Sequence, residues 1–437
     1  MSLKTPEKIR TFQRKLYHKA KAEPDFRFYQ LYDKIYREDI LYHAYRLAKA
    51  NGGSPGVDGV TFRMIESEGV EEWLSGIREK LHSKTYRPKP VRRVMIPKPG
   101  GGERPLGIPT IKDRVVQTAT KLVIEPIFEA DLEPYTYGYR PKRSVLDAVQ
   151  KVHKLLREGY TDVVDADLTK YFDTIPHNEL MKCIARRIVD RNVLHLIKQW
   201  LKSPVEEKDR RGRRRMSGGK KSTRGVPQGG VISPLLANLY INRFLKHWRM
   251  TERGKAFWAH VVSYADDFVI LSLGGGQQAL EWTRKVMRQM GLTLNEEKTA
   301  IRDAQKEPFD FLGYTFETVW LKKDGSRYMG AMPSKVSIDR LKRKVPERLK
   351  PQEKGPWPEV CKRLNALLKG WSAYFSYGTT QPAFRAVERN VYERVRVFLV
   401  QRHKVRSRGI SRFPSEKVFG KMGVFLPRPI GVCRCVP

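Results

Sequence analysis

The chain has 437 residues, of which 85 are Lys or Arg and 47 are Asp or Glu, so its formal net charge is +38. With 40% hydrophobic residues, the composition argues against a disordered chain. The length predicts several folded units of roughly 100–200 residues each. A charge of this size calls for an acidic partner, either nucleic acid or an anionic membrane. No apolar run approaches the roughly 18–20 residues that span a bilayer, so we expect a cytoplasmic, nucleic-acid-binding protein with no membrane partner.

The N-terminal part of the sequence predicts helices followed by a loop. Residues 39–48 have apolar side chains at helical spacing, within a stretch that is basic and rich in aromatic residues. Residues 51–59 are dominated by Gly and Pro, which stop a helix and favour a loop. We therefore place a boundary near residue 57.

A strand pair and a long helix are predicted next. Residues 92–97 and 105–108 are typical of two strands, and the turn between them is basic and rich in glycine. Thr110 followed by Asp113 indicates a helix start, and the apolar stripe behind it predicts a helix over 111–125. Beyond residue 333 the pattern becomes helical and basic, which indicates a separate helical domain.

Two further strand-like runs contain acids in apolar surroundings. Residues 163–168 are short and β-branched and include Asp167, and residues 261–271 are two apolar runs on either side of Asp266 and Asp267. We interpret the second run as a hairpin with the acids at its turn. A carboxylate that leaves water needs a partner charge or a metal, although an isolated Asp-Asp at a strand end often serves turn geometry alone.

If these strands pair, the carboxylates of Asp167, Asp266 and Asp267 converge at one edge of a sheet. Mg²⁺ takes one or two carboxylates and completes its shell with waters and substrate phosphate oxygens. Two such ions about 3.5–4 Å apart stabilise the attacking and leaving oxygens of an in-line phosphoryl displacement. The pattern therefore predicts two Mg²⁺ ions, with Mn²⁺ able to substitute, and phosphoryl transfer on nucleic acid.

Several motifs in a fixed order carry a resemblance to a known family. They are Asp167–Asp173, Gly225–Pro234, Tyr264–Asp267, Gly291–Thr299 and Phe311–Tyr314. Together they resemble a reverse transcriptase, most closely the bacterial group II intron reverse transcriptases, also called maturases. Residues 55–59 and 104–109 resemble segments particular to that family, and residues 370–375 resemble its thumb, or maturase, domain. Tyr-Ala-Asp-Asp alone would be a weak signal, whereas this many ordered motifs are specific.

The resemblance implies an α+β protein with the right-hand polymerase fold: fingers, a palm with an antiparallel sheet, and a helical thumb, preceded by a helical N-terminal extension. The corresponding domains are the extension and its loop at 1–57, fingers and palm at 58–330, the thumb at 331–405 and a basic tail at 406–437. The family often adds a DNA-cutting domain with cysteine-bound zinc. Near its end this sequence has only Cys433 and Cys435, so we expect no endonuclease and interpret the tail as a candidate DNA-binding segment.

The resemblance also assigns roles to individual residues. Asp167, Asp266 and Asp267 would be the catalytic, metal-binding acids, with the Leu168 carbonyl as a further metal ligand. The implied nucleotide-binding residues are Lys98, Arg104, Phe172, Gln228 and Lys298. The ring of Phe172 would exclude a 2′-hydroxyl by bulk, and Lys298 would meet the departing pyrophosphate. The plainer alternatives are core packing for Phe172, a solvated turn for Lys98 and Arg104, and a surface lysine for Lys298.

The implied primer and template contacts come from three segments. Tyr264 would lie beside the primer end, with core packing as a comparable alternative. The basic loop that contains Arg213, Arg214 and Arg215 would follow RNA phosphates, as would Lys362 and Arg363 on the thumb.

These assignments predict an RNA-directed DNA polymerase that also binds its parent intron RNA. Its partners would be an RNA template, the intron RNA, a DNA primer or target, and dNTPs. By resemblance, it would assist splicing and insert the intron by target-primed reverse transcription. Two alternatives stay open: an RNA-binding splicing cofactor with a dispensable polymerase, and a domesticated reverse transcriptase in phage defence or CRISPR adaptation.

Overall fold

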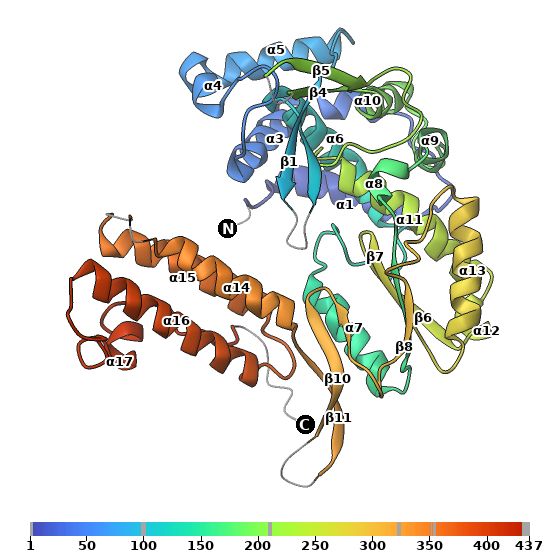
Figure 1. The fold of residues 1–437 in the computed structure, drawn as a ribbon. Coiled ribbons are helices and arrows are strands. Elements are labelled where there is room, and N and C mark those ends of the chain that lie inside the picture. Colours follow the sequence, from blue (N-terminus) through green and yellow to red (C-terminus); the bar gives the residue numbers. More distant parts are fainter. Residues whose placement is uncertain are drawn as a thin grey trace.

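The computed structural model describes residues 3–97, 102–208, 212–320, 325–350, 352 and 355–430. Within these ranges the chain forms a fingers region, a palm region and a helical thumb, which lie respectively at the top, on the right and on the left of Figure 1. No helix in this described part combines the length and the apolar composition needed to cross a membrane.

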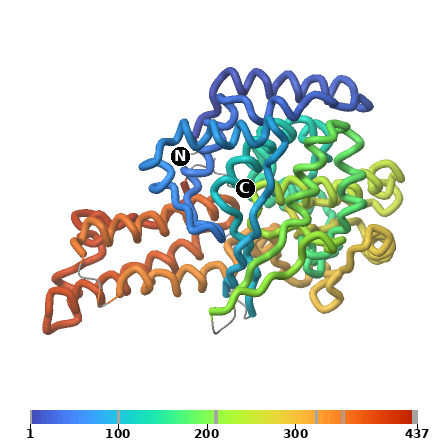
Figure 2. The backbone as a smooth tube through the Cα atoms, turned by 90° about the horizontal axis from the view of Figure 1, so that it is seen from above, coloured from blue at the N-terminus to red at the C-terminus, as the bar shows by residue number. Residues whose placement is uncertain are grey.

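The fingers combine N-terminal helices with a mixed sheet. The helices are α1 (Glu7–Ala22), α2 (Tyr32–Ile35), α3 (Glu38–Asn51), α4 (Phe62–Glu68), α5 (Val70–His82) and α6 (Ile111–Glu129). Helix α6 is the predicted helix, four residues longer than expected, and the Thr110 side chain caps it by accepting from the Asp113 N–H at 3.1 Å. Figure 2 shows α1 lying along the outside of this region.

The fingers sheet has the strand order β2-β1-β4-β5. Its strands are β1 (Val91–Pro97), β2 (Glu103–Ile108), β4 (Pro204–Lys208) and β5 (Arg214–Gly218). The predicted pairing of β1 with β2 is confirmed, because the two strands run antiparallel with Arg92 opposite Ile108. Strand β4 joins β1 in parallel although more than a hundred residues separate them in sequence.

The palm is built on an antiparallel sheet with the order β6-β7-β3-β8. Its strands are β3 (Asp162–Asp167), β6 (Ala259–Tyr264), β7 (Asp267–Ser272) and β8 (Ala300–Asp303), and its helices are α7 (Val145–Arg157), α8 (Tyr171–Thr174), α9 (His177–Ala185), α10 (Arg191–Leu201), α11 (Ser233–Met250), α12 (Arg253–Ala256) and α13 (Gly276–Gln289). The predicted hairpin is therefore β6 and β7, with the acids at its turn.

The palm sheet separates two hydrophobic cores. Val164 and Ile270 face a core shared with the fingers helices, whereas their neighbours Val163 and Leu271 face a core shared with the thumb. This alternation is the period-two pattern of a strand that is buried on both faces. The sheet is therefore fixed from both sides, which positions the acids at its end.

The thumb region follows a three-stranded sheet with the order β11-β10-β9. The strands are β9 (Phe309–Phe311), β10 (Tyr314–Trp320) and β11 (Arg327–Pro333), and the helices are α14 (Lys335–Arg348), α15 (Trp357–Tyr374), α16 (Gln381–Arg402) and α17 (Ser415–Phe419). In Figure 2 these helices extend away from the rest of the molecule. A helical C-terminal region was expected from the sequence and is present.

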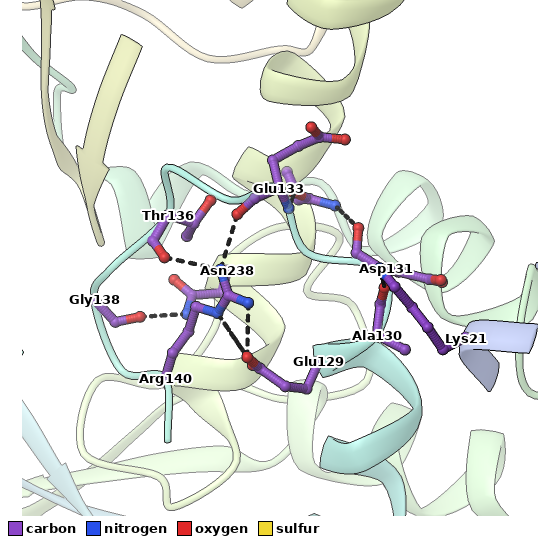
Figure 3. A network of polar contacts seen from close by, with 10 residues as sticks. Lys21, Glu129, Ala130, Asp131, Glu133, Thr136, Gly138, Arg140 and Asn238 are labelled. Atoms are coloured by element: carbon purple, nitrogen blue, oxygen red, sulfur yellow. Dashed lines mark hydrogen bonds and ion pairs between the residues drawn. The ribbon is translucent and has the colours of Figure 1, made fainter. Parts of the chain in front are cut away.

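A buried arginine holds the loop between α6 and α7 (Figure 3). The side chain of Arg140 is 5% exposed and pairs with the Glu129 carboxylate at 2.6 Å. It also donates to the carbonyls of Glu133 and Thr136. Asn238 on α11 fixes the same loop by donating to the Gly138 carbonyl at 2.6 Å. We call this segment, residues 129–140, the fingers–palm joint.

Candidate active site

The three predicted catalytic acids lie at one end of the palm sheet. Asp167 is the last residue of β3 and Asp267 is the first residue of β7, and the antiparallel register places them directly opposite each other. Asp266 lies in the turn between β6 and β7, next to Ala265, whose φ is 60°. We call Asp167, Asp266 and Asp267 the acid cluster.

The catalytic turn is supported from behind by the fingers–palm joint. Gly138 lies so close to the backbone of Ala265 that a Cβ at position 138 would overlap the Ala265 nitrogen. Two backbone hydrogen bonds also tie residues 135 and 137 to Ser263 on β6, at 3.0 and 2.9 Å. The turn is thus held by the strand register on one side and by this loop on the other.

The carboxylates of the acid cluster repel one another. Burial raises the pKa of Asp267 to about 7, and the charges of Asp266, Asp167 and Asp165 raise it further, whereas Lys298 lowers it. Burial also raises the pKa of Asp266, with a further contribution from Asp167 and an opposing one from Arg104. The site therefore carries negative charge that the surrounding side chains do not balance, and a bound cation would relieve this repulsion.

The donor chemistry of the cluster fits a hard divalent cation. Carboxylate oxygens are the ligands that Mg²⁺ prefers. As the side chains stand in the described ranges, no group of three or more His, Cys, Asp or Glu residues is arranged to hold a metal ion. The fit therefore rests on the opposed pair of Asp167 and Asp267 and on their mutual repulsion. The side chain of Leu168 is 4% exposed, so its backbone carbonyl is the part that could serve as a ligand.

Asp167 has two side-chain partners, both from the segment after α13. The Asn295 amide donates to Asp167 Oδ2 at 3.2 Å, and Lys298 Nζ lies 3.1 Å from the same oxygen. Lys298 was expected from the sequence at the departing pyrophosphate, and the structure instead places its ammonium on the acid cluster. Asn295 was not singled out in the sequence, although it belongs to the motif Gly291–Thr299.

Two of the predicted nucleotide-binding residues meet between the fingers and the palm. Arg104 on β2 donates from Nε to the Gln228 side-chain carbonyl at 2.8 Å, across 124 positions of sequence. The Gln228 backbone carbonyl accepts from the Gly107 N–H at 2.6 Å, which joins the loop to the strand. Phe172 on α8 is 5% exposed. Lys98 lies outside the described residues.

The comparisons with known families cover most of the chain. The family described as "Reverse transcriptase (RNA-dependent DNA polymerase)" matches residues 96–316, and "Group II intron, maturase-specific domain" matches residues 338–413. The chain belongs to the group II intron reverse transcriptases. The family and the right-hand fold predicted from the sequence are confirmed, as is the enzyme class, an RNA-directed DNA polymerase with an intron-splicing domain. RNA and DNA are the partners of such an enzyme.

Individual relatives support this membership. Protein YkfC of Escherichia coli (strain K12) is 36% identical over 70% of this chain and 87% of its own length. The group II intron-encoded protein LtrA of Lactococcus lactis subsp. cremoris is 28% identical over 66% of this chain and 56% of its own length. The putative COX1/OXI3 intron 1 protein of Saccharomyces cerevisiae is also 28% identical, over 65% of this chain. The match spans 39% of that yeast protein.

The predicted primer and template residues of the reverse transcriptase lie on three surfaces. Tyr264 ends β6, opposite Asp267, and packs against the core that the palm shares with the thumb. The basic residues are exposed on the fingers sheet and on α15, at positions Arg213, Arg214, Arg215, Lys362 and Arg363. Their contact with nucleic acid stays a prediction.

The thumb of the enzyme reaches the catalytic turn through aromatic side chains. Tyr374, at the end of α15, donates to the Leu312 carbonyl at 3.0 Å, and Tyr314 donates to the Tyr374 carbonyl at 2.9 Å. Burial raises the pKa of Tyr374 to about 12, and the neighbouring Tyr264 and Asp267 raise it further. The maturase-specific domain is therefore in contact with the polymerase site.

The sequence reading missed Tyr139. This residue has a φ of 57°, a strained value for a side chain other than Gly, and it is 44% exposed. Burial of its hydroxyl raises the pKa of Tyr139, and the charge of Asp266 adds to this effect while Arg104 opposes it. Tyr139 thus stands among the acid cluster and the fingers. A tyrosine followed by Arg-Pro has no catalytic signature of its own, so sequence pattern gave no reason to select it.

Proposed function

We propose that this enzyme copies its parent intron RNA into DNA at the acid cluster, and that it binds the same RNA to assist splicing and mobility by target-primed reverse transcription. The observation that carries the polymerase site is the register of the palm sheet, which sets Asp167 against Asp267 beside Asp266. The maturase-specific match over residues 338–413 supports the binding of intron RNA.

The residues that would hold two Mg²⁺ ions are the three acids and the Leu168 carbonyl. When bound, the ions would supply charge neutralisation for the attacking and leaving oxygens of the phosphoryl transfer. The sheet register keeps two of the acids on adjacent strands, and the fingers–palm joint keeps Asp266 in its turn. A reactive geometry held in advance in this way lowers the cost of bringing primer and nucleotide together.

The nucleotide would lie between the fingers and the palm. Arg104 presents a planar guanidinium that can donate to two phosphate oxygens of a dNTP at once. Gln228 holds the Nε side of that guanidinium at 2.8 Å, which leaves the two terminal nitrogens for phosphate. Phe172 is packed into the palm on α8, where its ring would limit the room beside the sugar.

Primer extension tests this proposal. The wild type should extend a DNA primer on an RNA template with Mg²⁺ and dNTPs, and the Asp266→Ala/Asp267→Ala variant should not. Asp339→Ala, which removes an exposed carboxylate on α14, serves as the matched control and should extend normally. Synthesis by the double variant at the wild-type rate would refute the assignment of the acids.

A second candidate function is a splicing cofactor whose polymerase is dispensable. The contact between the maturase-specific domain and the polymerase site favours weighing it, because both activities share one body. Intron splicing with the Asp266→Ala/Asp267→Ala variant separates the two functions. We expect splicing to persist, since the acids do not attract RNA phosphate, while synthesis is lost.

A further inference from the structure

The acid cluster has a cation of its own. Lys298 Nζ lies 3.1 Å from Asp167 Oδ2, and the charge of Lys298 lowers the pKa of the adjacent Asp267. Among the ion pairs of the described residues, Lys298 supplies the one that involves Asp167. One positive side chain therefore stands directly against three carboxylates.

Asn295 and Lys298 approach the same oxygen, but they are held very differently. The Asn295 N–H donates to the Asp167 carbonyl at 2.8 Å, in addition to the side-chain contact at 3.2 Å. Its neighbour Leu294 is buried and pairs with Leu168. Asn295 is thus fixed by backbone and side chain, so it can keep the Asp167 carboxylate in one orientation.

Lys298, in contrast, is mobile by construction. Its side chain is 68% exposed, while that of Asp167 is 29% exposed. The ammonium is carried on a flexible four-carbon chain, and an exposed pair of this kind is stabilised only weakly. The ion pair can therefore break at little cost when a stronger charge arrives.

An ammonium and a divalent cation cannot both take the same carboxylate position. Asn295 already uses one side of Asp167 Oδ2, and Lys298 uses another, so a cation bound at this oxygen must displace one of them. Lys298 is the partner that can leave, because Asn295 is anchored by its backbone.

We propose that Lys298 is the resting counter-ion of the acid cluster, and that it is released from Asp167 when a divalent cation binds, while Asn295 stays as the residue that positions the carboxylate. This inference rests on the proposed function, because it takes the cluster as the cation site. The released ammonium becomes free to meet a phosphate of the substrate. One side chain would then serve two states of the site in turn.

Binding of Mn²⁺ to the full chain without nucleic acid tests the release, with free Mn²⁺ measured by electron paramagnetic resonance. Removing a competitor of this strength should tighten binding, so Lys298→Gln should bind Mn²⁺ about two- to five-fold more tightly than the wild type. Lys170→Gln is the matched control, because it removes an equal charge three residues from Asp167 at a lysine that has no ion pair in the described ranges. Equal binding by the two variants, or weaker binding by Lys298→Gln, would overturn the proposal.

A second measurement follows the lysine itself. Amine acetylation, read out by mass spectrometry of peptides, should label Lys298 faster when Mn²⁺ is present and leave the rate at Lys170 unchanged. Unchanged labelling of Lys298 would also overturn the proposal. The Asp266→Ala/Asp267→Ala variant separates the two levels of inference. If that variant bound Mn²⁺ as tightly as the wild type, the cation site of the proposed function would itself be wrong.

Discussion

The fingers–palm joint and the acid cluster both bury charge, and they do so in opposite ways. In the joint, Arg140 meets Glu129 at 2.6 Å, and nearby Arg187 meets Asp131 at 3.2 Å, so each acid has a guanidinium (Figure 3). In the acid cluster, three carboxylates share one exposed ammonium. Matched buried charge fixes a loop, whereas unmatched buried charge marks a place that awaits a cation.

The two regions are physically connected, which gives the difference a purpose. The joint presses Gly138 against Ala265 in the catalytic turn, so the paired charges hold the backbone on which the unpaired charges stand. The rigidity of one region maintains the strained electrostatics of the other. Variants in the two regions should therefore fail in different ways, and the following predictions test this.

The largest effect is expected at the acid cluster. Asp266→Ala/Asp267→Ala should lower primer extension by about 10³-fold or more, because metal-assisted charge stabilisation contributes several kcal/mol to such a reaction. The same variant should unfold at the wild-type temperature or above it, because it relieves repulsion. Steady-state kinetics and thermal unfolding measure the two outcomes. Loss of activity together with marked loss of stability would remove the contrast.

At the joint, the opposite result is expected. Arg140→Ala leaves the Glu129 carboxylate buried without a partner, which should lower the free energy of unfolding by about 3–5 kcal/mol. Arg249→Ala is the control, because Arg249 forms an exposed pair with Glu133 and its loss should cost about 0–1 kcal/mol. Denaturant unfolding measures both. Equal losses in the two variants would show that burial of the joint does not matter.

RNA binding should respond to a third group of charges. Arg215→Ala and Lys362→Ala should each weaken RNA affinity several-fold and reduce the slope of log affinity against log salt by about 1. Glu359→Ala on the same helix as Lys362 is the control and should not weaken binding. Filter binding across a salt series measures the slope. An unchanged slope would show that these side chains do not contact phosphate.

The smallest effect is expected from pH, at a buried polar group between palm and thumb. Burial lowers the pKa of His153, which accepts from the Tyr377 hydroxyl at 2.7 Å and donates to the Met329 carbonyl at 2.8 Å. A histidine that is neutral in the fold binds fewer protons than in the unfolded chain, so stability should fall as the pH drops below about 6.5. Thermal unfolding at pH 7.5 and 5.5 measures this. His153→Gln should show a smaller difference between the two pH values, and an equal difference would exclude His153 as its cause.

Much of the polymerase site could be predicted because its signals are local. The β-branched runs around Asp167 and the Asp266-Asp267 turn predict strands, and the motif order suggests that they pair. Helix α6 was predicted from its cap and stripe, but its extension to Glu129 was not, because Pro126 near its end argues locally for an earlier stop. Local pattern is thus sufficient where a strand or helix start carries its own chemistry.

Long-range contacts could not be predicted in the same way. The parallel pairing of β4 with β1, the buried pair of Arg140 with Glu129, and the grip of Asn295 on Asp167 all depend on which segments meet in space. None of these residues has a local signature that distinguishes it from a surface residue of the same type. Lys298 illustrates the point, because its sequence motif indicated a phosphate partner and its observed partner is a carboxylate.

The most direct test of the account is anomalous diffraction from crystals of this enzyme grown with Mn²⁺. The account predicts an anomalous peak within bonding distance of the carboxylates of Asp167 and Asp266, at the end of the palm sheet. A fully formed site with both carboxylates ordered and no peak beside them, at a Mn²⁺ concentration that supports primer extension, would contradict it.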